Sequence, residues 1–301
     1  MSNIVYGNNV IDACVELVPA IRIAPLDISA ISMCHEGYAM PKGFGDGRYV
    51  SLHTKARYAI VSALEELELQ KDDVVTILTT SGNLYVSGCV TKAIETICRW
   101  NREVVIDTKA ILVIHEFGYP YKRLSELSKY GLPIIEDCAY AYFTKEEEMG
   151  TIGDYVIYSL TKSFNMQIGG VMVSKNKVRD RVSLEEKAYI LSHWLEGYRD
   201  NGDIIHKRLD NYSYLAQELE SLGIRPFFDW AEGIVPGVFI FHWRDDINYP
   251  ELKEYMQRNG IESSVFYGES AFYIPLHQNL SKRELDYMIA LLTYYYETKV
   301  K

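Results

Sequence analysis

The stretch that decides the fold runs from Gly131 to Ser174 and reads GLPIIEDCAYAYFTKEEEMGTIGDYVIYSLTKSFNMQIGGVMVS. It holds three short apolar runs, and the first of them ends in the acids Glu136 and Asp137. The second run leads into Lys162, and the third follows a pair of glycines. Short apolar runs bounded by turn residues are typical of buried strands. An acid and a lysine at the carboxyl ends of two such strands reach one crevice, where open α/β sheets bind their ligands.

This pair of residues suits pyridoxal phosphate. The Lys162 amine can hold the cofactor aldehyde as a Schiff base, and the Asp137 carboxylate can keep the pyridine nitrogen protonated, so that the ring acts as an electron sink. Each residue also has a plainer interpretation. Lys162 can be a solvated lysine at a strand end, and Asp137 can cap a helix or pair with a basic residue. The order of the motifs favours the cofactor, and Glu136 is expected on the opposite face of its strand.

Several weak motifs occur here in a fixed order. They are Glu136-Asp137-Cys138-Ala139-Tyr140, Gly150-Thr151-Ile152-Gly153-Asp154, Ser159-Leu160-Thr161-Lys162 and Gly169-Gly170. In these motifs the chain resembles the DegT/StrS-type sugar aminotransferases, which are fold type I, aspartate-aminotransferase-like enzymes that use pyridoxal phosphate. The resemblance extends from about residue 45 to 175 and from about 237 to the C-terminus. It implies that Lys162 and Asp137 are the catalytic, cofactor-binding pair.

The resemblance also implies where the cofactor phosphate binds. The family counterpart of Ser159 donates to this phosphate, although Ser159 can equally be an ordinary strand-end hydroxyl. A dianion favours a helix N-terminus, and the segment from His53 to Leu64 is similar to the family's helix entry. Lys55, Ala56 and Arg57 would then lie by the phosphate. In this chain Lys55-Ala56 replaces the usual pair of small residues. Three interpretations therefore stay open: backbone amides bind the phosphate, a side-chain charge of Lys55 or Arg57 binds it, or the segment is a plain basic first turn.

Two aromatic residues are further candidates for the cofactor site. Tyr140 stands where most family members have Gln or His, so its phenol either bonds the cofactor's 3-oxygen or packs with Tyr142. Tyr85 is the nearest candidate for the ring that stacks on the cofactor. The family's Gly-x-Asn-x-Arg-Met motif, whose Asn reaches the partner subunit's phosphate, is absent, and residues 196–201 occupy its place without matching it.

Composition is that of a globular protein acting on small molecules. Hydrophobic residues make up 48% and charged residues 24% of the 301 residues, and the net charge is -10. An acidic chain without basic clusters argues against a nucleic-acid partner. Five cysteines without Cys-x-x-Cys spacing predict neither disulfides nor a metal site, and they favour the cytoplasm. No apolar run is long enough for a membrane span.

The alternation of elements predicts an α/β fold with a mostly parallel sheet. Alanine and aliphatic residues at helical spacing predict a helix from about Thr54 to Leu67, and strands are expected at 74–78, 104–106, 111–114 and 134–135. Helices are expected at about 205–222, 250–259 and 281–297, with a strand at 238–243 between the first two. The predicted domains are an N-terminal segment 1–44, a large cofactor-binding α/β domain 45–175, a connecting segment 176–204 and a small α+β domain 205–301.

The resemblance implies a homodimeric aminotransferase that moves an amino group from a donor such as glutamate to a keto-sugar linked to a nucleotide. One alternative keeps the cofactor and changes the reaction, for example to a sugar dehydratase, although Lys162 counts against this because dehydratases of the family carry His there. The other is a non-catalytic family member that regulates or scaffolds a partner.

Overall fold

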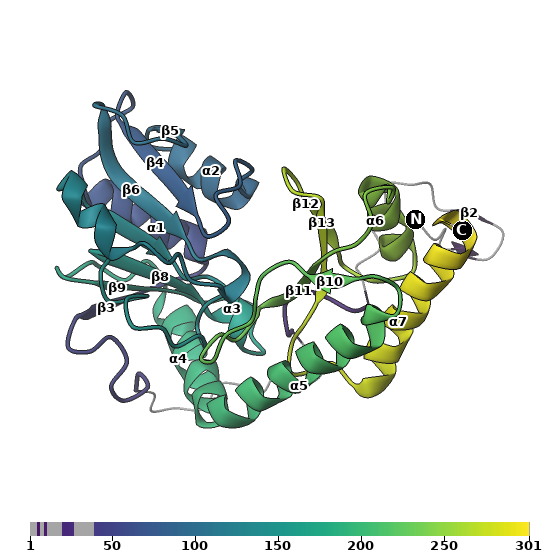
Figure 1. Cartoon of the computed structure of the whole chain (residues 1–301). Helices are drawn as coiled ribbons and strands as arrows, with labels where there is room; N and C mark the ends of the chain where they lie inside the picture. The colour runs from purple at the N-terminus through teal and green to yellow at the C-terminus, as the bar shows by residue number, and fades with distance from the viewer. Residues whose placement is uncertain (1–4, 7–8, 11–19, 27–38, 301) are drawn as a thin grey trace. The chain divides into compact units, whose positions relative to one another are not determined.

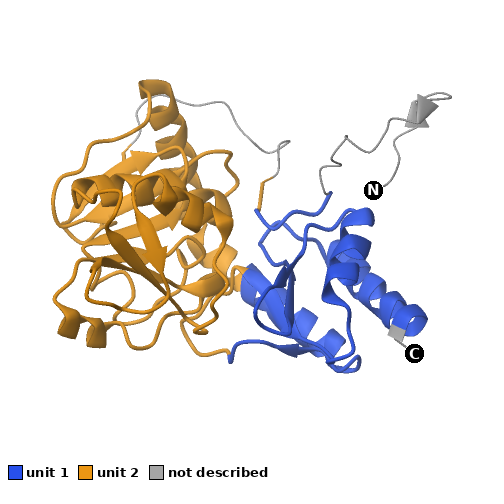
Figure 2. Cartoon of the chain, turned by 90° about the horizontal axis from the view of Figure 1, so that it is seen from above, with its two compact units in different colours: residues 1–24, 207–229, 238–301 blue, residues 25–206, 230–237 orange. Residues whose placement is uncertain are grey.

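The computed structural model describes residues 5–6, 9–10, 20–26 and 39–300. Most of the predicted segment 1–44 therefore lies outside the described residues. The chain forms two compact units, which are coloured separately in Figure 2. Unit 1 contains residues 1–24, 207–229 and 238–301, and unit 2 contains residues 25–206 and 230–237.

Unit 2 is built on a seven-stranded sheet with the order β3-β9-β8-β7-β6-β4-β5 (Figure 1). The neighbouring strands from β5 to β8 run parallel, and β9 runs antiparallel to both β8 and β3. This sheet confirms the predicted fold class. Its strands are β3 (Tyr49–His53), β4 (Val74–Thr79), β5 (Arg99–Asn101), β6 (Thr108–Ile114), β7 (Ile134–Asp137), β8 (Tyr155–Ser159) and β9 (Gly170–Ser174).

Helices cover both faces of this sheet (Figure 1). One face packs on α1 and α2, whose buried side chains include Ile60, Leu64 and Ile94. The other face packs on α4, through Ile190 and Trp194. The helices are α1 (Ala56–Glu66), α2 (Gly88–Glu95), α3 (Leu160–Ser163) and α4 (Leu184–Arg199), with 3₁₀-helices at Glu116–Gly118 and Ser125–Tyr130.

The segment 104–106, expected as a strand, is not one. Its apolar residues are largely on the surface, with Val105 45% and Ile106 97% exposed. A tight turn forms here, because the Thr108 backbone N–H donates to the Val105 carbonyl at 3.0 Å and the Thr108 hydroxyl accepts from the Val105 N–H at 2.9 Å. The strand beside β4 is instead β5, at Arg99–Asn101.

Helix α4 lies inside the segment 176–204. Its N-terminus carries a capping box, in which Ser183 accepts from the Glu186 N–H and Glu186 accepts from the Ser183 N–H. A reciprocal cap of this kind satisfies two backbone donors that the helix leaves unpaired. The polar composition of the segment did not indicate this helix, whose apolar side chains are buried.

Unit 1 is a small α+β unit. Its larger sheet has four antiparallel strands, in the order β10-β11-β13-β12, and the aromatic side chains of Phe239, Phe241 and Phe272 lie in its core. Its elements are β10 (Arg225–Pro226), β11 (Val238–His242), β12 (Ser264–Phe266), β13 (Ala271–Pro275), α6 (Tyr249–Arg258), α7 (Lys282–Tyr295) and a π-helix at Tyr296–Val300. Helix α5 (Asn201–Glu220) contains the boundary between the units, and β1 (Val5–Tyr6) pairs with β2 (Asn9–Val10).

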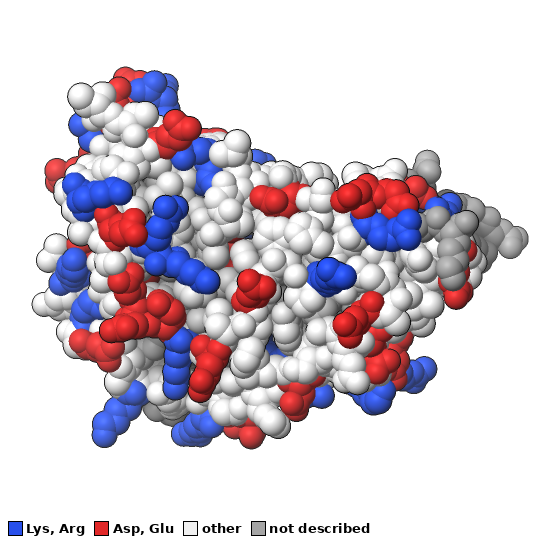
Figure 3. Space-filling view, in the orientation of Figure 1, with Lys and Arg blue, Asp and Glu red and all other residues white. Residues whose placement is uncertain are grey.

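On the face shown in Figure 3, Lys and Arg side chains are interspersed with Asp and Glu side chains. Within the described part of the chain, no helix combines the length and the apolar character that a membrane span requires.

Candidate functional site

The predicted site lies at the edge of the unit 2 sheet where the parallel strands end. In the sheet register Ser159, the last residue of β8, pairs with Gly170, which also pairs with His53 at the end of β3. Asp137, the last residue of β7, pairs with Ile157. Paired residues on neighbouring strands point to the same face, and Ile157 belongs to the core beneath α1. Asp137 and Ser159 therefore both face the α1 side of the sheet.

The N-terminus of α1 approaches this edge closely, at Gly170. A β-carbon on Gly170 would lie 2.5 Å from the Lys55 carbonyl carbon and 2.6 Å from the Ala56 nitrogen, so only glycine fits there. The neighbouring Gly169 N–H donates to the Thr54 carbonyl at 2.9 Å. Among the described residues, no side chain caps this helix terminus. The backbone donors of its first turn therefore face an edge that suits an anion.

The residues predicted for the phosphate differ in exposure. Ser159 is buried, and its hydroxyl lies 3.1 Å from that of Thr161. Lys55 and Arg57 are exposed and Ala56 is half-buried. The structure thus places all four at the same end of the sheet, with the two cations directed to the surface.

Asp137 and Lys162 act on each other electrostatically. Burial raises the pKa of Asp137, while the Lys162 ammonium, the Ala139 N–H and His115 lower it. The Ala139 N–H donates to Asp137 Oδ1 at 2.9 Å. Lys162 lies in α3, the single helical turn that follows β8 directly. A buried carboxylate beside a lysine is the pair that the sequence predicts for a pyridine nitrogen and an aldehyde.

Tyr140 lies against Lys162. The lysine Nζ is 3.5 Å from the centre of the Tyr140 ring, a direct cation–π contact. Tyr142 instead belongs to a separate aromatic cluster, where its hydroxyl accepts from Trp194 Nε1 at 2.7 Å and its ring packs edge-on against Phe164. The sequence foresaw neither of these contacts.

Tyr85 lies in the loop after β4 and is 44% exposed. Two residues that the sequence did not single out hold this loop. The Arg102 guanidinium donates to the carbonyls of Ile77 and Asn83, and Glu116 Oε2 accepts from the Ser81 N–H at 2.7 Å. These bonds fix the part of the loop that precedes Tyr85, at the same edge of the sheet.

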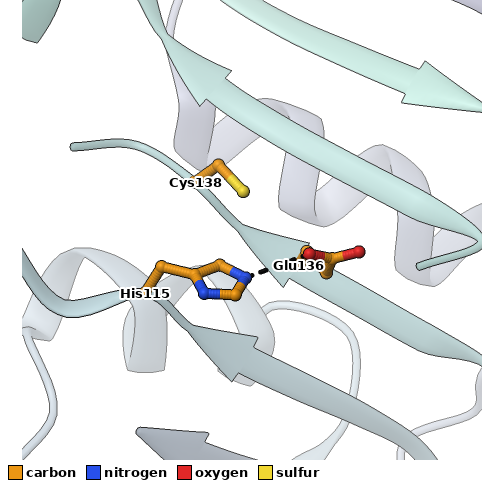
Figure 4. Close-up of side chains that lie close together, drawn as sticks. All are labelled: His115, Glu136 and Cys138. Atoms are coloured by element: carbon orange, nitrogen blue, oxygen red, sulfur yellow. Dashed lines mark hydrogen bonds and ion pairs between the residues drawn. The ribbon is translucent and has the colours of Figure 1, made fainter. Parts of the chain in front are cut away.

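A buried cluster of His115, Glu136 and Cys138 lies on the opposite face of β7 (Figure 4). His115 Nδ1 accepts from the Tyr121 N–H at 3.1 Å, so its Nε2–H donates to Glu136 Oε2 at 3.0 Å. Glu136 also accepts from the N–H groups of Gly150 and Gly153, at 2.7 and 2.6 Å. The Gly150-x-x-Gly153 motif fits this close approach, because Gly150 has φ 76° and a β-carbon on Gly153 would lie 2.9 Å from Glu136 Oε1.

The three potential ligand atoms of this cluster lie within 4.8 Å of one another, which is close enough for a metal ion. Their chemistry suits a hydrogen-bonded cluster better. Both Glu136 oxygens and both His115 nitrogens already have partners, and burial raises the pKa of the Cys138 thiol well above its usual range. A protonated thiol is a poor metal ligand. The sequence could have singled out His115, because this residue, like Asp137, stands at the end of an apolar run.

The comparisons with known proteins agree with this fold. A model of the DegT/DnrJ/EryC1/StrS aminotransferase family matches residues 99–194, roughly a third of the chain. No curated protein matches the sequence. Among solved structures, the aminotransferase TlmJ from Streptoalloteichus hindustanus is similar with a TM-score of 0.70 and 15% identity, over 84% of this chain and 87% of that chain.

Two further structures support the same fold. A DegT DnrJ EryC1 StrS aminotransferase from Brucella abortus has a TM-score of 0.67 and 16% identity, over 84% of this chain and 87% of that chain. NtdA from Bacillus subtilis, solved with bound cofactor PMP, has a TM-score of 0.63 and 15% identity, over 84% of this chain and 74% of that chain.

The fold is that of the fold type I, pyridoxal phosphate-dependent aminotransferases, as the sequence predicted. The matched residues 99–194 contain both Asp137 and Lys162. The family match and the fold therefore agree with the family that the sequence predicts.

Proposed function

We propose that this chain binds pyridoxal phosphate at the carboxyl edge of its seven-stranded sheet and transfers an amino group to a keto-sugar. The observation that carries the proposal is the gathering of Lys162, Asp137 and the N-terminus of α1 at that edge. When bound, the cofactor would act as an electron sink for the carbon next to the amino group.

Each of these groups fits one part of the cofactor. Lys162 Nζ would hold the aldehyde carbon and, once released, move the proton between the two carbons that exchange the amino group. Asp137 would hold the proton of the pyridine nitrogen, and its burial keeps water from competing for that bond. The first-turn amides of α1 and the Ser159 hydroxyl would donate to the phosphate.

Lys55 and Arg57 are proposed as the cations that compensate for the absent Asn-Arg motif. Their positions at the start of α1 support this role. If one of them contacts the phosphate, its replacement by Ala removes a charge-assisted hydrogen bond and weakens cofactor binding roughly ten- to a hundredfold. Unchanged affinity in both variants would assign the phosphate to backbone amides and Ser159. Tyr85 is proposed to stack on the cofactor ring, and the Tyr140 hydroxyl is proposed to reach its 3-oxygen.

The family resemblance suggests a nucleotide-linked keto-sugar as acceptor, glutamate as donor, a homodimer as the active form, and a cytoplasmic location. Sedimentation of the purified protein tests the dimer, because a purely monomeric protein with turnover would refute a site completed across an interface. Incubation with glutamate and a nucleotide-linked keto-sugar tests the reaction, with formation of 2-oxoglutarate as the measured product.

The decisive experiment is cofactor uptake. The protein is mixed with pyridoxal phosphate, treated with borohydride and digested, and the peptide carrying the cofactor is identified by mass spectrometry. We expect the label on Lys162 and its loss in Lys162→Ala, together with turnover lower by several orders of magnitude. Lys175, an exposed lysine paired with Asp154 in the same unit, provides the matched control, Lys175→Ala. Labelling of other lysines only, or no uptake at all, would favour the scaffold alternative.

A further inference from the structure

We propose that Tyr140 is a positioning residue whose ring face holds the Lys162 ammonium group, and that the segment 230–237 holds the ring in place. The inference deepens the proposed function, and rests on it only for the role of Lys162. Its starting point is the 3.5 Å between Lys162 Nζ and the centre of the Tyr140 ring. A cation at this distance lies directly on the negative face of the ring.

The ring is held on its other sides by two chain segments. Phe117 lies 5.7 Å from Tyr140 between ring centres. Gly237 lies even closer, since a β-carbon on it would be 2.5 Å from Tyr140 Cδ1. The two segments are bonded to each other, because the Gly237 N–H donates to the Phe117 carbonyl at 2.7 Å.

The backbone at Phe117 is adapted to this contact. Phe117 has φ 55° and ψ 21°, a left-handed conformation that is uncommon for a bulky residue. Strained residues of this kind persist where the surrounding structure over-determines them, and they cluster at functional sites. The next residue, Gly118, has φ 96°, and a β-carbon there would lie 2.6 Å from the Val235 carbonyl oxygen. The turn 117–118 thus fits against the segment 230–237 with no room for larger residues.

Thr144 fixes the same segment from a second side. Its hydroxyl donates to the Gly118 carbonyl at 2.8 Å and accepts from the Val235 N–H at 3.0 Å. The Lys145 N–H also donates to the Gly233 carbonyl at 2.8 Å. Residues 117–118, 144–145 and 233–237 therefore form one bonded frame around Tyr140.

This frame has a role in the proposed reaction. In the proposed reaction Lys162 would be released when the amino donor enters, and it would have to stay within reach of the atoms between which it moves a proton. A released lysine would lie on the face of the Tyr140 ring, which attracts the ammonium group and so fixes the position of Lys162 Nζ. Tyr140 would act here through its ring, whatever its hydroxyl binds.

The test measures Lys162 itself and needs no cofactor. The apoprotein is treated with formaldehyde and cyanoborohydride, and methylation of each lysine is followed by mass spectrometry. Only the neutral amine reacts, so a ring that favours the ammonium form slows methylation. We expect Tyr140→Leu to speed methylation of Lys162 roughly 2- to 30-fold, the range of a cation–π contact. Tyr140→Phe keeps the ring and should match the parent, while the exposed Lys71 serves as the internal reference.

The frame is tested by Gly237→Ala, whose added methyl group has to displace the ring. Its Lys162 should react faster than in the parent, and the substitution should have no further effect in the Tyr140→Leu background. An unchanged Lys162 rate in Tyr140→Leu, or a Tyr140→Phe protein as fast as Tyr140→Leu, would overturn the inference. Cofactor uptake measured on the same preparations tests the proposed function separately. A parent that takes up no cofactor would refute that function, whereas the methylation rates would still decide the role of the ring.

Discussion

At the scale of single residues, the site depends on one strand, β7, that sends two acids to opposite faces. Asp137 faces the α1 side, where burial raises its pKa and Lys162 opposes the rise. Glu136 faces the other side and accepts hydrogen bonds from His115, Gly150 and Gly153. Adjacent residues of a strand thus serve the proposed chemistry and the structure beneath it.

The first prediction concerns Asp137→Asn. The amide has the size of the carboxylate, so the fold and the cofactor should be retained. Most of the turnover should be lost, because an amide does not keep a pyridine nitrogen protonated. The measurement compares bound cofactor per chain with the rate of 2-oxoglutarate formation. Near-normal turnover would show that Asp137 has only a structural role.

The second prediction concerns Glu136→Gln. The side-chain amide keeps one acceptor oxygen and directs N–H groups at a backbone donor, so at least one buried hydrogen bond is lost. Unfolding free energy should fall by roughly 1–3 kcal/mol, as measured by urea titration. Glu66→Gln, an exposed change at the end of α1, is the matched control and should stay within about 0.5 kcal/mol of the parent. Equal stability of the two variants would refute a structural role for the Glu136 bonds.

At the scale of elements, the contact between β9 and α1 decides where the helix terminus lies. The third prediction is that Gly170→Ala weakens cofactor binding at least tenfold, because its methyl group has to push the backbone of Lys55 and Ala56 outward. Gly88→Ala in α2 is the control, since a β-carbon there meets nothing within 4 Å. Fluorescence titration with pyridoxal phosphate measures both. If both variants bind as tightly as the parent, the phosphate does not depend on this helix terminus.

The elements near the site were predictable because their signals are local. The apolar run before Glu136 and the helical spacing of Ala59, Ile60 and Ala63 fix β7 and α1 with little help from distant residues. The run 104–106 carries the same apolar signal, but the strand predicted there was wrong, because a turn closed by Thr108 exposes these residues. Helix α4 was missed because charged residues at both of its ends and in the chain around it dominate the composition of the segment 176–204.

The contacts of Tyr140 could not be predicted for a different reason. They join residues about 100 positions apart in the sequence, at Tyr140 and Gly237, and they depend on the left-handed backbone of Phe117. No periodicity or short motif records such a contact. The roles of the individual site residues and the predicted domain limits stay predictions.

At the scale of the whole molecule, two buried histidines make stability depend on pH. His277 in unit 1 accepts from the Asn279 N–H through Nδ1 at 3.2 Å and contacts the Arg22 carbonyl through Nε2 at 3.0 Å, an arrangement of the neutral ring. Burial, with Arg208 nearby, lowers the pKa of His277 to about 4. Burial, with Arg181 nearby, likewise lowers the pKa of His53 in unit 2 to about 4.

The fourth prediction follows from these shifts. Between about pH 6.5 and 4 the unfolded chain binds more protons than the folded one, so the free energy of unfolding falls as the pH falls. The stabilising contribution of each histidine is fully present only above about pH 6.5. Each histidine should contribute about 2 kcal/mol less at pH 5 than at pH 7.5. Urea titrations at the two pH values measure the loss, which should shrink by this amount in His277→Gln. An identical loss in the variant would contradict the assignment.

Unit 1 is assembled from three separate stretches of chain. Residues 230–237 belong to unit 2, although they follow residues 207–229, which belong to unit 1. The frame around Tyr140 can therefore close only after Gly237 has been made, and Gly237 precedes β12, β13 and α7 in the chain. Domains usually fold as units while synthesis proceeds from the N-terminus. In this chain the frame around Tyr140 is complete only after residue 237 has been made, and a nascent chain that stops before residue 230 leaves both units incomplete.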